Sequence, residues 1–253
     1  MITTIEHGPV RELRLNRPPA NALSTEMMQA IRQAVEAAPK DGALALVISG
    51  SPGMFSAGLD VPLLLTLDRS SISDAWRALY AMMEVIARSP IPTAAAITGH
   101  APAGGTVVTL FCDYRIVAEG KWKLGLNEVQ VGIPLPPVIL AGLRRLVGPR
   151  NADQLGVRGM LVPPAQALQY GLVDEVVPTE QVVDRAIAWC SELLALPASA
   201  MSHTRRQART DLVAIFHPDL SQELDSVIAN WWSEETQGVL QGLAQRLKPV
   251  VGR

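Results

Sequence analysis

Hydrophobic and polar residues alternate with two different periods near the start of the chain. Short β-prone runs at 2–5 and 10–15 flank the turn signal His7-Gly8-Pro9, and together they predict a β-hairpin. Behind Ser24, a typical N-cap residue, apolar residues recur at helical spacing as far as Ala38. A helix is therefore expected to follow the hairpin directly.

Strand and helix patterns keep alternating through the rest of the chain. The further predicted strands are 43–49, 93–98, 114–118 and 173–177. The further predicted helices are 74–88, a short buried one at 104–111, then 138–147, 151–158 and 164–170. From Glu180 onward only helix is predicted, with breaks at Pro197 and Pro218. A repeated β-β-α theme that ends in helices predicts an α/β fold, with a core at 1–195 and a helical C-terminal region at 196–253.

The composition is that of a folded globular protein. The 253 residues suffice for one large domain, and 48% hydrophobic against 18% charged residues argues against disorder. A net charge of -2 gives no basic surface for nucleic acid. Residues 89–112 lack Asp, Glu, Lys and Arg, but prolines and glycines interrupt them, so we expect buried backbone and no membrane span. The first residues, MITTIEHG, carry no secretory signal, so a cytoplasmic location is expected.

Neither a disulfide framework nor a metal site is predicted. A chain of this length can build its core without disulfide bonds, so Cys112 and Cys190 need not be paired. The four histidines and two cysteines show no short ligand spacing, and we therefore expect no bound metal.

A glycine-rich loop at 99–106 is the first candidate for chemistry. It nearly matches the phosphate-binding pattern G-x-x-x-x-G-K-[ST] but lacks the lysine, which argues against nucleotide hydrolysis. Gly104 and Gly105 stand at a predicted helix start, where backbone N–H groups are unpaired and unshielded and can form an oxyanion or anion site. The alternative is that these glycines only permit close packing.

Two further segments carry candidate residues. The loop 56–60, Ser-Ala-Gly-Leu-Asp, places small residues between a strand and a later helix and can supply one more N–H; the alternative is a tight turn capped by Asp60. Glu128 is a single carboxylate in the neutral, glycine-bounded segment 125–134. Burial there would raise its pKa, which suits a general base that must also return its proton. The alternative is a solvated surface glutamate.

Together these segments resemble the crotonase (enoyl-CoA hydratase/isomerase) superfamily over nearly the whole chain. The matching motifs are RPPANAL at 17–23, FSAGLD at 55–60, residues 97–105, CDYRI at 112–116, the segment 125–134 that carries Glu128 and that we call the glutamate loop, and AxxLxxGLVDEVVP at 165–178. Within the superfamily, SAGLD, PAGG, CDYRI and GLNE are similar to the Δ3,Δ2-enoyl-CoA isomerases. The resemblance implies a spiral of β-β-α turns with a helical C-terminal region that packs homotrimers, sometimes paired into hexamers.

The resemblance also implies roles for individual residues. The backbone N–H groups of Leu59 and Gly104 match the family's oxyanion donors, which hold the thioester oxygen of an acyl-CoA as it becomes an enolate. Lys248 resembles the contact to the CoA phosphates, from its own or a neighbouring subunit; an ordinary basic tail is the alternative. Coenzyme A enters as part of the substrate, and no other cofactor is implied. The residues that match the CoA cradle are Ala20, Ala22, Ser56 and Ala57.

One departure from the family decides between reactions. Enoyl-CoA hydratases of this superfamily position water with two glutamates, and this chain has Val107 and Glu128 at the two positions. A 1,3-proton shift needs only one carboxylate, which takes a proton from C2 of a 3-enoyl thioester and returns it to C4. We therefore expect an isomerase. The alternatives are hydration or another crotonase-family reaction on an acyl-CoA, and an acyl-CoA-binding protein without turnover.

Other conspicuous residues have less specific interpretations. His100 is a polar loop residue or a catalytic one. The pair Trp231-Trp232 anchors a subunit contact or is buried within the chain. A stripe that forms either core or the wall of an acyl pocket consists of Trp76, Leu79, Tyr80 and Met83. An apolar face expected to pack against neighbouring subunits consists of Leu220, Leu224, Val227, Trp231 and Leu240.

Overall fold

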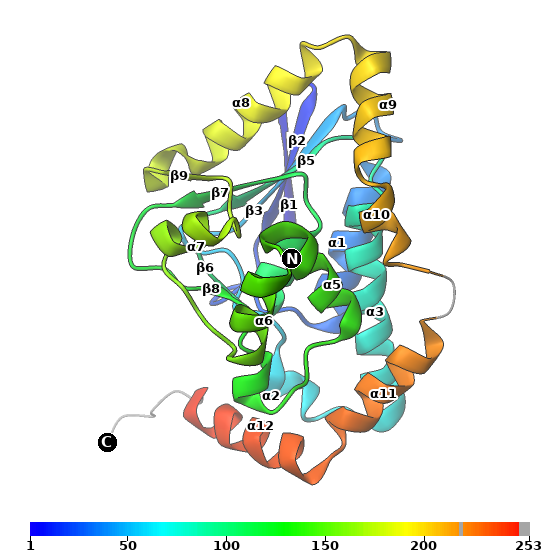
Figure 1. The fold of residues 1–253 in the computed structure, drawn as a ribbon, viewed down its shortest axis with the longest axis vertical. Coiled ribbons are helices and arrows are strands. Elements are labelled where there is room, and N and C mark those ends of the chain that lie inside the picture. The colour runs from blue at the N-terminus through cyan, green and yellow to red at the C-terminus, as the bar shows by residue number, and fades with distance from the viewer. Residues whose placement is uncertain (218–219, 248–253) are drawn as a thin grey trace.

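Two sheets organise the fold, and the larger one has six strands (Figure 1). The computed structural model describes residues 1–217 and 220–247. In sheet order the six strands are β1 (Ile2–His7), β2 (Val10–Leu15), β3 (Ala45–Ser49), β5 (Thr93–Ile97), β7 (Tyr114–Ala118) and β9 (Glu175–Val177). The predicted hairpin is confirmed, because β1 and β2 pair antiparallel, and the remaining neighbours pair parallel. The smaller sheet consists of β4 (Gly53–Met54), β6 (Gly99–Pro102) and β8 (Leu124–Gly125).

The chain winds as a spiral in which each turn contributes one strand to each sheet. β3, β5 and β7 join the larger sheet, and β4, β6 and β8 follow them into the smaller one. Helices then close the turns, which confirms the repeated β-β-α theme. The three strands of the smaller sheet escape prediction because runs of two to four residues are too short to show a period.

Helices cover both faces of the larger sheet. Their bounds are α1 (Thr25–Ala37), α2 (Val61–Leu64), α3 (Arg69–Ala87), α4 (Gly104–Leu110), α5 (Pro137–Val147), α6 (Pro149–Val157), α7 (Pro164–Tyr170) and α8 (Val182–Leu194). Short 3-10 turns occur at η1 (Glu128–Val131) and η2 (Thr179–Gln181). Ser24 caps α1 as predicted, accepting a hydrogen bond from the N–H of Met27 at 3.2 Å. α3 begins earlier than predicted, because Asp68 caps it by accepting from Ser71 at 2.8 Å.

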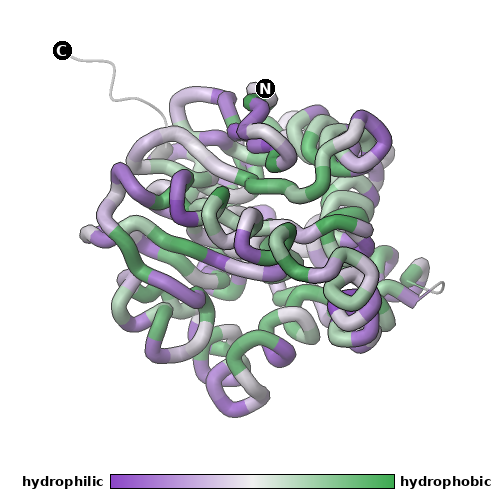
Figure 2. The backbone as a smooth tube through the Cα atoms, turned by 90° about the horizontal axis from the view of Figure 1, so that it is seen from above, coloured by the Kyte–Doolittle hydropathy of each residue, from purple (hydrophilic) through white to green (hydrophobic). Residues whose placement is uncertain are grey.

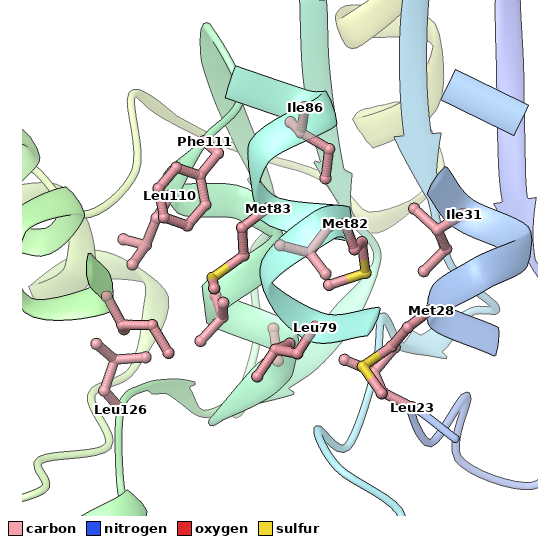
Figure 3. Close-up of a cluster of buried hydrophobic side chains, with 14 of the residues drawn as sticks. Leu23, Met28, Ile31, Leu79, Met82, Met83, Ile86, Leu110, Phe111 and Leu126 are labelled. Atoms are coloured by element: carbon pink, nitrogen blue, oxygen red, sulfur yellow. The ribbon is translucent and has the colours of Figure 1, made fainter. Parts of the chain in front are cut away.

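The hydrophobic core lies on either side of the larger sheet. α8 packs across β2, β3, β5 and β7 on one face. On the other face, α1 packs against α3 and α3 packs against α4, with Met82, Met83 and Phe111 among the buried side chains (Figure 3). Hydrophobic and hydrophilic residues alternate along the outer helices, as expected for amphipathic elements that shield this core (Figure 2). The uncharged segment 89–112 forms β5, β6 and α4 inside the core. None of the helices in the described part of the chain combines the length and apolar character that a membrane span requires.

In the described part of the C-terminal region, four helices run along one side and one end of the molecule (Figure 1). They are α9 (Ala198–Ala208), α10 (Thr210–Ala214), α11 (Ser221–Trp231) and α12 (Glu234–Leu247). Asp113, before β7, fastens the first two by accepting hydrogen bonds from Arg205 at 2.7 Å and Arg209 at 2.6 Å. Arg209 also donates to the carbonyls of Ala87 and Phe111, at the ends of α3 and α4.

Part of the predicted apolar face of the C-terminal helices is buried within the chain itself. Val227, Trp231 and Leu240 are buried within the chain, and the Trp231 ring packs edge-on against Trp76 at 6.3 Å between centroids. These three side chains are covered by their own chain, because α11 folds back onto α3, whereas Leu220 and Leu224 stay partly exposed; packing of this face against a neighbouring subunit stays a prediction. Helical periodicity revealed the apolar face but not its partner. Oligomerisation itself stays a prediction.

Candidate active site

Two segments far apart in the sequence are joined by hydrogen bonds, in a contact that we call the clasp. Between residues 20–23 and 56–60, the Leu23 N–H donates to the Gly58 carbonyl at 2.8 Å and the Ala57 N–H to the Ala20 carbonyl at 2.9 Å. The Ser56 hydroxyl is fully buried and donates to the Asn21 carbonyl at 2.8 Å. The cradle residues predicted from the sequence therefore come together. Ala20, Ala22 and Ala57 stay partly exposed, whereas the Ser56 side chain supports the loop from inside.

An ion pair that the sequence did not predict reinforces this clasp. The Arg17 guanidinium donates to the Asp60 carboxylate at 2.6 Å and to the Ala22 carbonyl at 3.1 Å. Asp60 in turn caps α2 by accepting from Leu63. No local pattern relates residues 17 and 60, so only their position in the family motifs could have indicated the pair.

The loop that contains Leu59 touches the start of α4 backbone to backbone. A Cβ added to Gly104 would lie 3.1 Å from the Gly58 Cα and 3.3 Å from the Leu59 nitrogen. Gly58 has φ +82°, which favours glycine. Ala103, just before α4, has φ 48° and ψ -121°, a conformation that is strained for a residue with a side chain. The surrounding bonds thus hold the two loops at a separation that side chains at Gly58 and Gly104 would prevent.

Two backbone N–H groups are left unused at this contact. The bridge between Leu23 and Leu59 uses the carbonyl of Gly58 and the N–H of Asp60, and thereby leaves out the Leu59 N–H. Gly104 is the first residue of α4, and its N-cap residue, Ala103, has no side-chain acceptor. Among the described residues, neither N–H donates to an acceptor. Both donors are available to a ligand atom.

The glutamate loop is attached to the same start of α4. β8 pairs with β6, and the Ala103 N–H donates to the Gly125 carbonyl at 2.8 Å. The Gly125 N–H donates in turn to the Thr106 hydroxyl at 2.8 Å. Leu126 then lies in the same buried cluster as Leu110 (Figure 3). Glu128 follows as the first residue of η1, so the fold ties the glutamate loop to the residues that flank Gly104.

Glu128 is a buried carboxyl group that forms no ion pair with any of the residues the structure describes. The residue is 7% exposed, and within the described part of the chain Oε2 has no hydrogen-bond partner. Burial raises the pKa of Glu128 from 4.5 to about 7. Glu12 is also buried, but it differs because its carboxylate accepts from Ser49, His7 and Arg14. A carboxyl with a pKa near neutrality can both accept and return a proton.

Val107 supplies no polar group to this site. It lies in the first turn of α4, its N–H donates to the Ala103 carbonyl at 3.0 Å, and its side chain is 1% exposed. The position at which hydratases of the resembled superfamily carry a second glutamate is therefore apolar and buried here.

The other residues singled out in the sequence have contacts that account for them structurally, or lie outside the described residues. The Nδ1 atom of His100 accepts from the Lys123 N–H at 3.2 Å, and its ring packs edge-on against Trp122. The stripe on α3 is core: all four side chains are buried, and the Tyr80 hydroxyl donates to Glu223 at 2.6 Å. Lys248 lies outside the described residues. The two cysteines are buried and unpaired.

Similarity to known proteins agrees with this geometry. Residues 6–241 match the enoyl-CoA hydratase/isomerase family. Human mitochondrial enoyl-CoA delta isomerase 1 is 32% identical over 246 residues, which are 96% of this chain and 82% of the relative. A probable enoyl-CoA hydratase, echA17, of Mycobacterium avium is 33% identical over 213 residues, 84% of this chain and 81% of the relative. The crystal structure of human mitochondrial delta3-delta2-enoyl-CoA isomerase superposes with a TM-score of 0.93 at 30% identity and covers 99% of both chains. The chain is thus an enzyme of the enoyl-CoA hydratase/isomerase family and has the crotonase fold.

Proposed function

We propose that the protein is a Δ3,Δ2-enoyl-CoA isomerase, which moves a double bond from C3 to C2 of an acyl-CoA thioester. The observation that supports this most is the buried carboxyl of Glu128 on a loop bonded to the residues that flank Gly104, together with two N–H donors that no described residue uses and Val107 where a second acid would stand. The similarity to the human mitochondrial isomerase is consistent with this choice.

In the proposed reaction, Glu128 is both base and acid. Its carboxylate takes a proton from C2 of the 3-enoyl thioester, and the C–H electron pair delocalises over C2, the double bond and the thioester carbonyl. The resulting dienolate oxygen is held by the N–H groups of Leu59 and Gly104, which act as the oxyanion hole. Glu128 then returns the proton to C4. The double bond now lies between C2 and C3, the carboxylate is regenerated, and no atom is gained or lost.

The clasp between residues 20–23 and 56–60 is the proposed CoA cradle. Ala20, Ala22 and Ala57 are small and partly exposed, so a pantetheine chain can approach their backbone, and Ser56 keeps the loop in shape. We assign Lys248 to the CoA phosphates. The proposal requires no cofactor beyond the CoA of the substrate. The assembly we propose is a homotrimer, or a hexamer of two trimers, and sedimentation as a monomer at micromolar concentration would exclude it.

Hydration is the second candidate, because the relative from Mycobacterium avium bears the name of a probable enoyl-CoA hydratase. Adding water requires a group that orients and activates it, and the valine side chain at 107 can neither accept nor donate a hydrogen bond. Incubating the purified protein with 3-enoyl and 2-enoyl CoA thioesters separates the two reactions, since hydration adds the mass of one water and isomerisation adds none. We expect interconversion of the enoyl thioesters with little 3-hydroxyacyl product. Robust hydration by the unmodified protein would overturn the assignment.

A third candidate, binding without turnover, is tested in the same samples. A protein that only binds acyl-CoA leaves the thioester unchanged: it forms neither the shifted enoyl isomer, separated by chromatography, nor the hydrated product, detected by mass. Binding of acyl-CoA without either product would therefore exclude both enzyme assignments.

A further inference from the structure

The turn that carries Glu128 is closed by its own backbone. The N–H of Ile133 donates to the Glu128 carbonyl at 3.0 Å, and the N–H of Gly132 bonds to the same carbonyl and to that of Val129. Gly132 has φ +77°, the left-handed conformation that ends such a turn. Any group that fixes Gly132 therefore fixes the backbone of Glu128 as well.

Such a group comes from α12, more than a hundred residues later in the chain. The Thr236 hydroxyl donates to the Gly132 carbonyl at 2.5 Å, and Thr236 is 3% exposed. The Ser233 hydroxyl donates to the Thr236 hydroxyl at 3.0 Å, so the Thr236 proton is directed toward Gly132. The helix also sits directly on the turn, because a Cβ added to Gly132 would lie 3.3 Å from the Thr236 Cα and the Val239 Cβ.

The same helix reaches the other half of the site. α12 packs against η1 and also against α2, which lies next to it in Figure 1, and α2 begins directly after Leu59 and its capping neighbour Asp60. One helix thus packs both against the turn that presents the carboxyl and against the helix that follows the first N–H donor. Catalytic groups must be held to within fractions of an ångström by such supports.

We propose that Thr236 is a positioning residue, whose hydrogen bond to Gly132 lets α12 hold the Glu128 turn in register with the two N–H donors. This inference rests on the isomerase function proposed above. Thr236 itself touches neither the carboxyl nor the substrate, and it acts only through the turn.

The test replaces Thr236 with valine, which keeps the shape and removes the hydroxyl, and with serine, which keeps the hydroxyl. We expect Thr236→Val to lower kcat by about tenfold to a hundredfold, the effect of a small misplacement of a catalytic group. KM should stay within about twofold, because the CoA cradle does not contact α12 through this residue. Thr236→Ser should restore most of kcat. Equal kcat values for wild type and the valine variant would overturn the proposal.

A purely structural role of Thr236 in α12 predicts a different result. Gly238 lies in the same helix, and a Cβ added there meets nothing within 4 Å, so Gly238→Ala strengthens the helix without a new contact. If Thr236 acts only by stabilising α12, adding Gly238→Ala to Thr236→Val should restore kcat, which would overturn the positioning role. We expect kcat to stay low in the double variant.

Hydrogen exchange tests the contact independently of the reaction. In Thr236→Val the amides of Gly132 and Ile133, both bonded to the Glu128 carbonyl, should exchange about tenfold faster, as expected when a supporting hydrogen bond is lost. Unchanged exchange at these amides would refute the support role even if the wild type proves to catalyse another reaction. Absence of isomerisation by the wild type, with faster exchange in the variant, would instead reject the proposed function and keep the support role.

Discussion

The buried carboxyl of Glu128 is needed for activity but lowers the stability of the fold when it is ionised. Glu128→Gln should therefore lower turnover and raise stability. The amide is nearly isosteric but cannot accept the substrate proton, so turnover should fall by about 10²- to 10⁴-fold, the usual range for general acid–base groups. The folded protein should nevertheless become more stable near pH 8. At that pH the wild type must bury an ionised carboxylate whose Oε2 has no partner among the described residues, whereas glutamine is neutral.

The size of the stability gain follows from the pKa of Glu128. A rise from 4.5 to about 7 corresponds to about 3 kcal/mol of unfavourable free energy once the group is ionised. Between these two values the folded state binds more protons than the unfolded state, so the stability of the wild type falls as the pH rises. The glutamine variant has no such slope. For a chain of this length, 3 kcal/mol corresponds to a Tm difference of roughly 6 to 12 °C near pH 8, and most of it should vanish near pH 5.

Thermal unfolding of both proteins at the two pH values, together with the enoyl thioester assay, measures these effects. Glu12→Gln is the matched control, because Glu12 is equally buried but satisfied. Although burial opposes it, the bonds from Ser49, His7 and Arg14 lower the pKa of Glu12, so this variant should lose stability. A Glu128→Gln variant that is no more stable than wild type near pH 8 would refute the reasoning about the unpaired charge. Near wild-type turnover would refute the role of Glu128 as base.

Three further predictions concern the same site. In the free enzyme, kcat/KM should rise with pH through about 7, because burial raises the pKa of Glu128 to that value and only the carboxylate is a base; a profile that is flat between about pH 5 and 8 would contradict this. Val107→Glu should add a measurable yield of 3-hydroxyacyl-CoA, detected by mass, at a cost of about 2 to 5 kcal/mol for burying a polar group; no gain in hydration would mean that more than this one carboxyl separates the two reactions. Gly104→Ala should lower kcat by about 10²- to 10³-fold, as losing an oxyanion donor does, because the new Cβ would lie 3.1 Å from the Gly58 Cα; Gly238→Ala, with open space around it, should leave kcat unchanged.

Local sequence patterns predicted the elements whose signals are local. The hairpin, the Ser24 cap and the strand at 114–118 each carry their signal within a few residues, and they are observed at or near the predicted positions. The small sheet was missed because its strands are held by the neighbouring turns of the spiral and not by their own pattern. The burial of Trp231 was left open for a related reason, since helical periodicity defines an apolar face and does not identify what covers it.

In the candidate site, too, residues within sequence motifs were predicted, and contacts between distant residues were not. Motif resemblance located Leu59, Gly104 and Glu128 in the sequence, and the fold ties the three segments to one another through backbone bonds. The supports around them were not predicted. Arg17 with Asp60, and Thr236 with Gly132, join residues that are far apart in sequence. Such pairs depend on the tertiary path of the chain, which a single sequence leaves undefined.

The two unused N–H groups belong to the main chain, and this determines how the site can vary. An alanine scan would remove the Leu59 side chain and leave its N–H in place, so the scan would score that position as dispensable to the chemistry. The Leu59 side chain is only partly buried, and its size can change with modest effect on the core. Substitutions there can reshape the surroundings of an acyl group while the proposed charge-stabilising donor is retained. Gly104 is the opposite case, because its lack of a side chain is what allows the two loops to touch. The site therefore offers one position for evolving specificity and forbids change at the other.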